Sequence, residues 1–145
     1  MTGAFVWINP TSNRVKAGAL AGSLTNHGYF TIRIDGTAYQ AHRLAWLYMT
    51  GEWPEHEIDH IDGNRLNNSW RNLRDVPRRI NAQNMRSAKK TSKSGLLGVV
   101  PYGGRWIARI TANRKEKHLG IFDTTEAAQA AYLSAKRELH EGCTL

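Results

Sequence analysis

The sequence of 145 residues has one cysteine, Cys143, four prolines and no apolar run near the ~18 residues that a membrane-spanning helix needs. One cysteine excludes a disulfide framework and any cysteine-based zinc finger. The opening stretch MTGAFVWINP lacks the basic and then apolar order of a secretory signal. We therefore expect a cytoplasmic protein that has no membrane partner.

Acidic residues are also scarce, at 12 Asp and Glu against 20 Lys and Arg, which gives a formal net charge of +8. This balance favours a polyanionic partner, because each phosphate that the protein neutralises releases a counterion. Residues 52–62 hold five acids and no Lys or Arg, whereas residues 86–118 hold nine basic residues and a single acid. An acidic pocket followed by a basic surface suits a phosphate enzyme that uses a cation; the alternative is two solvated patches of opposite sign.

Short strands are predicted near the N-terminus. YFTIRI at residues 29–34 alternates in polarity, and Asp35-Gly36 is a hairpin turn signal because both residues tolerate a positive φ. TAYQAH at 37–42 would be the return strand. RLAWLYM at 43–49 then reads as a short helix that Gly51 and Pro54 end.

The stretch IDHIDGNRLNNSWRNLRDV at residues 58–76 carries four Asn beside an Asp-His pair, although Asn favours neither helices nor strands. VPRRINAQNMRS at 76–87 then reads as a helix, with Pro77 in its first turn and Asp75 as its cap. Neighbouring strand residues point to opposite sides, so Asp59 and His60 can serve different tasks. Asp and Asn oxygens suit hard cations such as Mg²⁺, and a His can take a proton from water. A turn-rich surface loop is the alternative interpretation.

DHIDGNRLNNSWRNLR followed by NAQN resembles the HNH endonucleases of phages and introns, whose site is a ββα-metal finger. The resemblance implies that His60 is the general base, that Asp59 and Asn81 bind one divalent ion, Mg²⁺ or Mn²⁺, and that Asn72 holds the loop. Asn84 is the rival ligand. Asn64, Asn67, Asn68 and Asp62 are assigned to turn and loop chemistry. For His42 and Arg43, in AHRLAW, we expect a structural or DNA-contact role.

A second module is predicted from Gly95 onward. LLGVV, RWIARIT and EKHLGIF read as three strands, with Arg105 and Arg109 on the face of the second strand opposite Trp106. Asp123 to Glu126 resembles a capping box for a helix that places Ala128, Ala131, Tyr132, Ala135 and Leu139 on one stripe and that Gly142 ends.

GLLGVV together with HLGIFDT and the Ala-rich helix resembles the APETALA2-type DNA-binding domain, which lays a three-stranded sheet in the major groove. The resemblance implies that Arg105, Arg109 and His118 face DNA. Lys115 and Lys117 would touch phosphates, as would Lys89 and Lys90 of the basic linker. Val100 stands where the plant domains have Arg, so base specificity is not carried over.

These observations predict an α+β protein with three parts: an N-terminal and HNH nuclease module at 1–86, a basic linker at 87–94 and an APETALA2-type module at 95–145. The predicted function is that of a metal-dependent DNA endonuclease of homing type, encoded by a phage or mobile element, which acts on double-stranded DNA as a monomer or homodimer. The alternatives are a non-catalytic DNA-binding protein on the same scaffold and an RNA-binding module or RNase.

Overall fold

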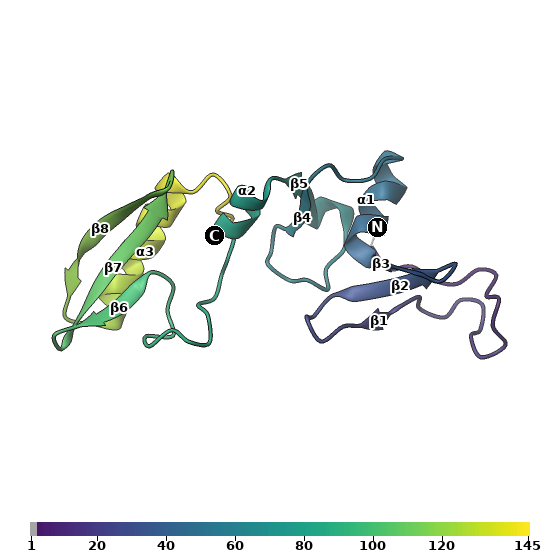
Figure 1. Cartoon of the computed structure of the whole chain (residues 1–145), viewed down its shortest axis with the longest axis horizontal. Helices are drawn as coiled ribbons and strands as arrows, with labels where there is room; N and C mark the ends of the chain where they lie inside the picture. The colour runs from purple at the N-terminus through teal and green to yellow at the C-terminus, as the bar shows by residue number, and fades with distance from the viewer. Residues whose placement is uncertain (1–2) are drawn as a thin grey trace. The chain divides into compact units, whose positions relative to one another are not determined.

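The structure is a computed structural model that describes residues 3–145. The chain is of mixed α and β type, with small helices and three antiparallel sheets. It divides into two compact units, Met1–Arg78 and Arg79–Leu145 (Figure 1). Each unit has its own hydrophobic clusters. The predicted boundaries of the nuclease module, the linker and the DNA-binding module, after residues 86 and 94, stay a prediction.

The first unit opens with a three-stranded antiparallel sheet, in the order β1 (Ser23–Leu24), β2 (Phe30–Ile34), β3 (Thr37–Gln40). The predicted hairpin turn is confirmed, with Asp35 and Gly36 at φ of 48° and 80°. Helix α1 (Ala41–Thr50) begins two residues before the predicted start and ends at Gly51, whose φ is 81°. Its apolar side packs on the sheet through a cluster of Ala21, Ile32, Ala41 and Leu44.

A second antiparallel pair follows, made of β4 (Glu57–His60) and β5 (Leu73–Val76), with the short 3₁₀ helix η1 (Trp70–Asn72) just before β5. In its register Asp59 faces Arg74 and His60 faces Leu73. Ile58 and Leu73 pack with Ala45 of α1, and the rings of Trp46 and Trp70 lie 4.9 Å apart. This packing holds the β4–β5 hairpin, which carries the Asp-His pair, against α1.

Helix α2 (Arg78–Gln83) is half the predicted length, and the prediction that Asp75 caps it is wrong. The Asp75 carboxylate instead accepts hydrogen bonds from the backbone N–H groups of Glu55 and His56, at 2.7 and 2.9 Å. Asp75 therefore holds the entry to β4. Residues 84–98 form no helix or strand, as expected for the basic linker within them.

The second unit contains the predicted three-stranded sheet and its helix: β6 (Val99–Tyr102), β7 (Arg105–Ala112), β8 (Lys115–Phe122) and α3 (Thr125–Leu139). The strand order is β6-β7-β8, all antiparallel, and α3 covers one face through Ala128, Tyr132 and Ala135. The cap of α3 is Thr124, whose hydroxyl accepts from the Ala127 N–H, so the capping prediction for Asp123 is wrong by one residue. The helix also ends at Leu139, before Gly142.

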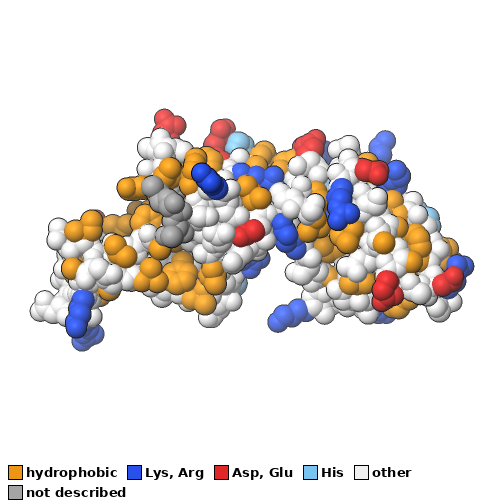
Figure 2. All heavy atoms as spheres, turned by 180° about the vertical axis from the view of Figure 1, so that it is seen from behind, with side chains coloured by type: hydrophobic (Ala, Val, Ile, Leu, Met, Phe, Trp, Pro, Cys, Tyr) orange, Lys and Arg blue, Asp and Glu red, His pale blue; other side chains and the backbone are white. Residues whose placement is uncertain are grey.

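Charged side chains are distributed over both units. On the face drawn in Figure 2, Lys and Arg are scattered among polar and hydrophobic groups and do not gather in one patch. Across residues 3–145, no helix combines the length and the apolar character required to cross a bilayer.

Candidate active site and nucleic-acid interface

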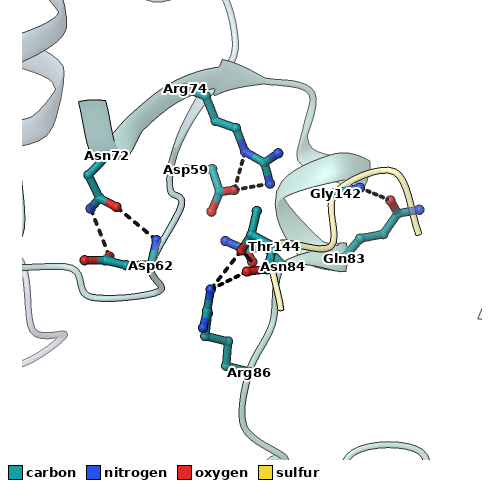
Figure 3. A network of polar contacts seen from close by, with 9 residues as sticks. All are labelled: Asp59, Asp62, Asn72, Arg74, Gln83, Asn84, Arg86, Gly142 and Thr144. Atoms are coloured by element: carbon teal, nitrogen blue, oxygen red, sulfur yellow. Dashed lines mark hydrogen bonds and ion pairs between the residues drawn. The ribbon is translucent and has the colours of Figure 1, made fainter. Parts of the chain in front are cut away.

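The end of β4 presents Asp59 and His60, each about 5% exposed, on opposite sides of the strand. Asp59 lies opposite Arg74 of β5, and its Oδ2 accepts from Arg74 Nε and Nη2 at 2.8 and 2.7 Å (Figure 3). The two strands thus place a carboxylate and a guanidinium in direct contact at a largely buried position. Arg74 fixes the orientation of the carboxylate that the sequence singles out as a metal ligand.

His60 is oriented by an amide from the loop that follows it. His60 Nε2 lies 3.0 Å from Asn68 Oδ1. An amide oxygen only accepts, so this hydrogen bond favours the ring form that carries a proton on Nε2. The sequence assigns Asn68 to loop chemistry, and no local pattern predicts its contact with His60.

Two aromatic rings pack beside His60. The His42 ring lies edge-on to the His60 ring, with centroids 5.2 Å apart, and the Tyr29 ring lies 5.3 Å from His42. Burial, and to a smaller extent the charges of His60 and Arg43, lower the pKa of His42 from 6.5 to about 4. His42 is therefore neutral near pH 7 and packs against His60 without adding a positive charge there.

Asn72, at the end of η1, ties together the two ends of the loop between β4 and β5. Its Oδ1 accepts from the Asp62 backbone N–H at 2.9 Å. Its Nδ2 donates to Asp62 Oδ1 at 2.9 Å and to the Asn67 carbonyl at 2.7 Å (Figure 3). Its own carbonyl accepts from the Ile61 N–H at 2.8 Å. These are the contacts that a brace for the segment after His60 requires.

Asp62 is the hydrogen-bond acceptor at the centre of the loop. Its carboxylate also accepts from the Asn64 backbone N–H at 2.8 Å and from Asn67 Nδ2 at 2.7 Å. Desolvation alone would raise the pKa of Asp62, but the hydrogen bonds from Asn67, Asn64 and Asn72 outweigh it and lower that pKa below its ordinary value. The sequence Asp62-Gly63-Asn64 indicates a turn, but it does not show the hydrogen bonds that join Asp62 to Asn64, Asn67 and Asn72.

The two candidate amide ligands lie in the second unit. Asn81 is part of α2, whereas Asn84 follows the end of the helix, and its backbone N–H donates to the Asn81 carbonyl at 3.0 Å. Asn84 is 5% exposed, and its Oδ1 accepts from the Thr144 hydroxyl at 2.5 Å (Figure 3). The rival ligand Asn84 therefore lies in the turn just after α2 and not in the helix that carries Asn81.

The candidate ligands fit a hard, hydrated cation better than a metal ion that three or more side chains hold. Within residues 3–145 no group of three or more His, Cys, Asp or Glu side chains is placed to hold a metal ion. A carboxylate oxygen of Asp59 and an amide oxygen such as that of Asn81 are hard ligands, and Mg²⁺ keeps most of its waters when bound by one or two of them. A zinc site of several nitrogen or sulfur ligands does not fit these residues.

The face of the second sheet that α3 does not cover carries polar side chains. Arg105 and Arg109 of β7 are about half exposed and pair with Asp123 at 2.7 Å and with Glu116 at 3.3 Å. A β-bulge opposite Ala108 and Arg109, at Gly120 with φ of 140°, puts Leu119 in the core and His118 opposite Arg109. The open face is thus formed by Val100, Tyr102, Arg105, Ile107, Arg109, Thr111, Glu116, His118 and Ile121.

The other predicted DNA contacts are exposed as well, but not on this face. Lys115 and Lys117 alternate with Glu116 and His118 along β8, so they lie on the other side of the sheet. Lys89 and Lys90 lie in the irregular segment between α2 and β6. Among the predicted DNA contacts, the structure brings together Arg105, Arg109 and His118 on one surface and places the four lysines elsewhere.

Comparison with known proteins shows that the β4–β5 hairpin lies inside a segment that matches a known domain family. Residues 39–83 match the family model of the HNH endonucleases. The chain is 35% identical over 106 residues to Protein 3.8 of Escherichia phage T7, a match that covers 71% of this chain and 86% of the phage protein. The chain belongs to the family of Protein 3.8 and carries an HNH endonuclease domain. No solved structure matches the chain.

The HNH domain spans α1, β4, β5 and α2, and the order β4-β5-α2 along the chain fits the ββα-metal module of this family. The domain indicates a nuclease whose substrate is DNA. The matched residues end at residue 83, before β6, so the APETALA2-type resemblance of the second sheet stays a prediction.

Proposed function

We propose that this protein is a metal-dependent DNA endonuclease of homing type, which hydrolyses phosphodiester bonds at the β4–β5 hairpin and recognises double-stranded DNA with the sheet β6-β7-β8. The observation that carries the proposal is the buried Asp59-His60 pair at the end of β4, each residue held by a specific partner, inside the segment that matches the HNH endonucleases.

His60 is the proposed general base. The hydrogen bond between its Nε2 and Asn68 supports this role, because it orients the ring that would take a proton from the attacking water. Asn72 is the proposed positioning residue, because its hydrogen bonds to Asp62, Asn67 and Ile61 fix the chain that leaves His60. Packing of the neutral His42 ring against His60 limits rotation of the base.

Asp59 and Asn81 are the proposed ligands of one divalent ion, Mg²⁺ or Mn²⁺. When bound, such an ion stabilises the negative charge that develops on the leaving oxygen. Arg74 holds the Asp59 carboxylate in a fixed orientation through Oδ2. Between the two amides we favour Asn81, because its spacing from His60 fits the third position of the HNH pattern best. Asn84 remains the rival ligand, and its Oδ1 accepts from the Thr144 hydroxyl.

The open face of the second sheet is the proposed DNA-reading surface. The major groove admits a two-stranded β-ribbon, and Arg105, Arg109 and His118 project from the two longer strands of this sheet. Lys89, Lys90, Lys115 and Lys117 are proposed to contact phosphates from the linker and the strand edge. The protein would act as a monomer or homodimer, the monomer nicking one strand.

The alternative is a DNA-binding protein that has kept the HNH scaffold without catalysis. Incubation of supercoiled plasmid with the wild-type protein and Mg²⁺ or Mn²⁺ separates the two. We expect nicked or linear product, and we expect EDTA to abolish it. Absence of cleavage with either metal on DNA that the protein binds would favour the binding protein.

A matched pair of histidine variants tests the assignment of the base. His60→Ala should lose cleavage by about 10²–10⁴-fold while it keeps DNA binding. His27→Ala, at an exposed histidine of the same unit, should cut at the wild-type rate. Normal cleavage by His60→Ala would show that another group is the base, and competition by duplex RNA in the binding assay would point to an RNA target.

A further inference from the structure

We propose that the C-terminal segment 140–144 is a positioning element for α2, the helix that carries Asn81. This inference rests on the proposed function, because it concerns the placement of a proposed metal ligand. The segment and the helix are about 60 residues apart in the sequence and belong to the same compact unit. Four contacts along the helix and the turn after it join them.

The contacts begin at the first turn of α2. Arg79 Nη2 lies 3.2 Å from Glu141 Oε2 in an exposed ion pair. The backbone N–H of Gly142 donates to Gln83 Oε1 at 2.9 Å (Figure 3). Both ends of this six-residue helix are therefore linked to two successive residues of the C-terminal segment.

The contacts continue past the end of the helix. The Thr144 hydroxyl donates to Asn84 Oδ1, and Arg86 Nη2 donates to the Thr144 carbonyl and hydroxyl oxygens at 3.1 and 2.9 Å (Figure 3). Lys136 of α3, which is 1% exposed, donates from Nζ to the Met85 carbonyl. The turn that contains Asn84 is held by α3 and by the segment after it.

Gly142 shows how close the two backbones are. A Cβ on Gly142 would lie 2.1 Å from the Ile80 carbonyl oxygen and 3.0 Å from Gln83 Cβ. Real contacts of this kind are not that short, so any side chain here must push the segment away from α2. Gly142 is required here for close approach and not for a positive φ.

Helix α2 needs this support because it cannot be stable alone. Its six residues are far below the ~12–15 that an isolated helix requires, and none of them is fully buried. Its stability must come from hydrogen bonds and packing made by other segments. The C-terminal segment provides them at Arg79, Ile80, Gln83 and Asn84, on either side of Asn81.

The consequence is that the proposed ligand helix of the nuclease is anchored on the unit that carries the proposed DNA-reading sheet. Loss of the anchor should misplace Asn81 without touching the sheet face. Misplacement of a reacting group by about 1 Å can cost roughly 10²-fold in rate. We therefore expect cleavage and DNA affinity to separate in variants of this segment.

Two substitutions test the anchor in the full chain. Gly142→Ala adds the Cβ that would meet Ile80, and Thr144→Val removes the hydroxyl that Asn84 and Arg86 contact, with nearly the same shape. Thr144→Ser keeps the hydroxyl and is the matched control. Each protein is measured by hydrogen exchange of residues 79–86, by the dissociation constant for DNA in Ca²⁺, and by single-turnover cleavage across Mg²⁺ concentrations.

We expect faster exchange in residues 79–86 for Gly142→Ala and Thr144→Val, cleavage slower by about 10–100-fold at saturating DNA, and a higher Mg²⁺ requirement. DNA affinity should not change, and Thr144→Ser should behave as the wild type. Unchanged exchange in both variants would overturn the proposal whatever the activity. Wild-type cleavage rates in both variants would also overturn the proposal, but they would leave the nuclease assignment intact. If the wild-type protein itself never cuts, the nuclease assignment is refuted, and hydrogen exchange alone then tests the anchor.

Discussion

The β4–β5 hairpin of the first unit and the open face of the sheet β6-β7-β8 are both polar, but they hold their side chains in different ways. In the hairpin loop, Asn72 and Asp62 each take part in several hydrogen bonds, and His60 and Asp59 are about 5% exposed. On the open face, Arg105 and Arg109 are 52% and 47% exposed and pair with exposed carboxylates. The first arrangement fixes the groups in place, and the second leaves them able to exchange partners.

Each arrangement suits the task that we propose for its region. Proton transfer to a positioned base requires its geometry to be fixed before substrate arrives. A surface that meets DNA must exchange protein contacts for contacts with bases and phosphates. Substitutions in the hairpin should therefore be costly for both stability and cleavage, and charge changes on the open face should mainly alter affinity and its salt dependence.

The largest effect on stability is expected for Asn72→Ala. It removes hydrogen bonds to Asp62 and Asn67, so we expect the free energy of unfolding to fall by about 2–4 kcal/mol and cleavage by about 10²-fold. Asn64→Ala in the same loop removes one exposed contact, to the Leu66 N–H, and should change both by little. Denaturant unfolding and plasmid cleavage would show this. Equal effects of the two variants would mean that the loop has no specific brace.

A smaller loss is expected for Arg74→Leu. The largely buried Asp59 carboxylate loses two charged hydrogen bonds, which should cost about 2–3 kcal/mol, less than a fully buried pair because a quarter of the Arg74 side chain is exposed. The matched control is Arg78→Leu, which removes the 3.9 Å exposed pair with Glu57. Thermal unfolding should separate them clearly. Similar losses would indicate that the Asp59-Arg74 pair does not support the hairpin.

The pH dependence of stability should report the protonation of the His42 side chain. Its pKa is lowered to about 4 in the folded chain from 6.5, so the unfolded chain binds more protons between these values and stability falls as the pH drops below 6.5. The loss should reach about 2 kcal/mol between pH 7.5 and pH 5. His42→Leu should flatten this part of the curve, and His27→Gln should not. An unchanged slope in His42→Leu would show that other groups titrate there.

The smallest effect is expected on the open face. Glu116→Gln releases Arg109 and removes a negative charge, so DNA affinity should rise by about 2–5-fold and its salt dependence should steepen, with stability unchanged. Glu138→Gln makes the same change of charge at an exposed position of α3, away from the sheet, and should leave affinity as it is. Fluorescence anisotropy at several salt concentrations would measure both. Weaker binding by Glu116→Gln would instead assign Glu116 a direct contact with DNA.

The local parts of the fold could be predicted from the sequence. The Asp35-Gly36 turn, the alternation of Trp106 and Arg105 along β7, and the three strands followed by a helix are all confirmed. These features depend on neighbouring residues, and polarity patterns report them directly. The ends of α2 and α3 differ from the prediction, because contacts that no local pattern shows set them.

The partners of the site residues could not be predicted. The contact of Asn68 with His60 depends on how a loop of Asn residues folds, and each of those amides has the same local chemistry. The pair of Asp59 and Arg74 depends on strand register, which the loop between the strands sets. The contacts of Thr144 and Gly142 with α2 join segments that are far apart in the chain, and no periodicity reports such contacts.

The most direct test of the account measures binding and single-turnover cleavage of one DNA target by two variants in parallel. His60→Ala should bind as the wild type does and lose cleavage, whereas Arg105→Ala with Arg109→Ala should bind more weakly and still cut at the wild-type rate when DNA is saturating. If His60→Ala instead weakens binding and cuts normally at saturation, or if the double variant binds normally but cannot cut, the division of chemistry and recognition between the two regions is wrong.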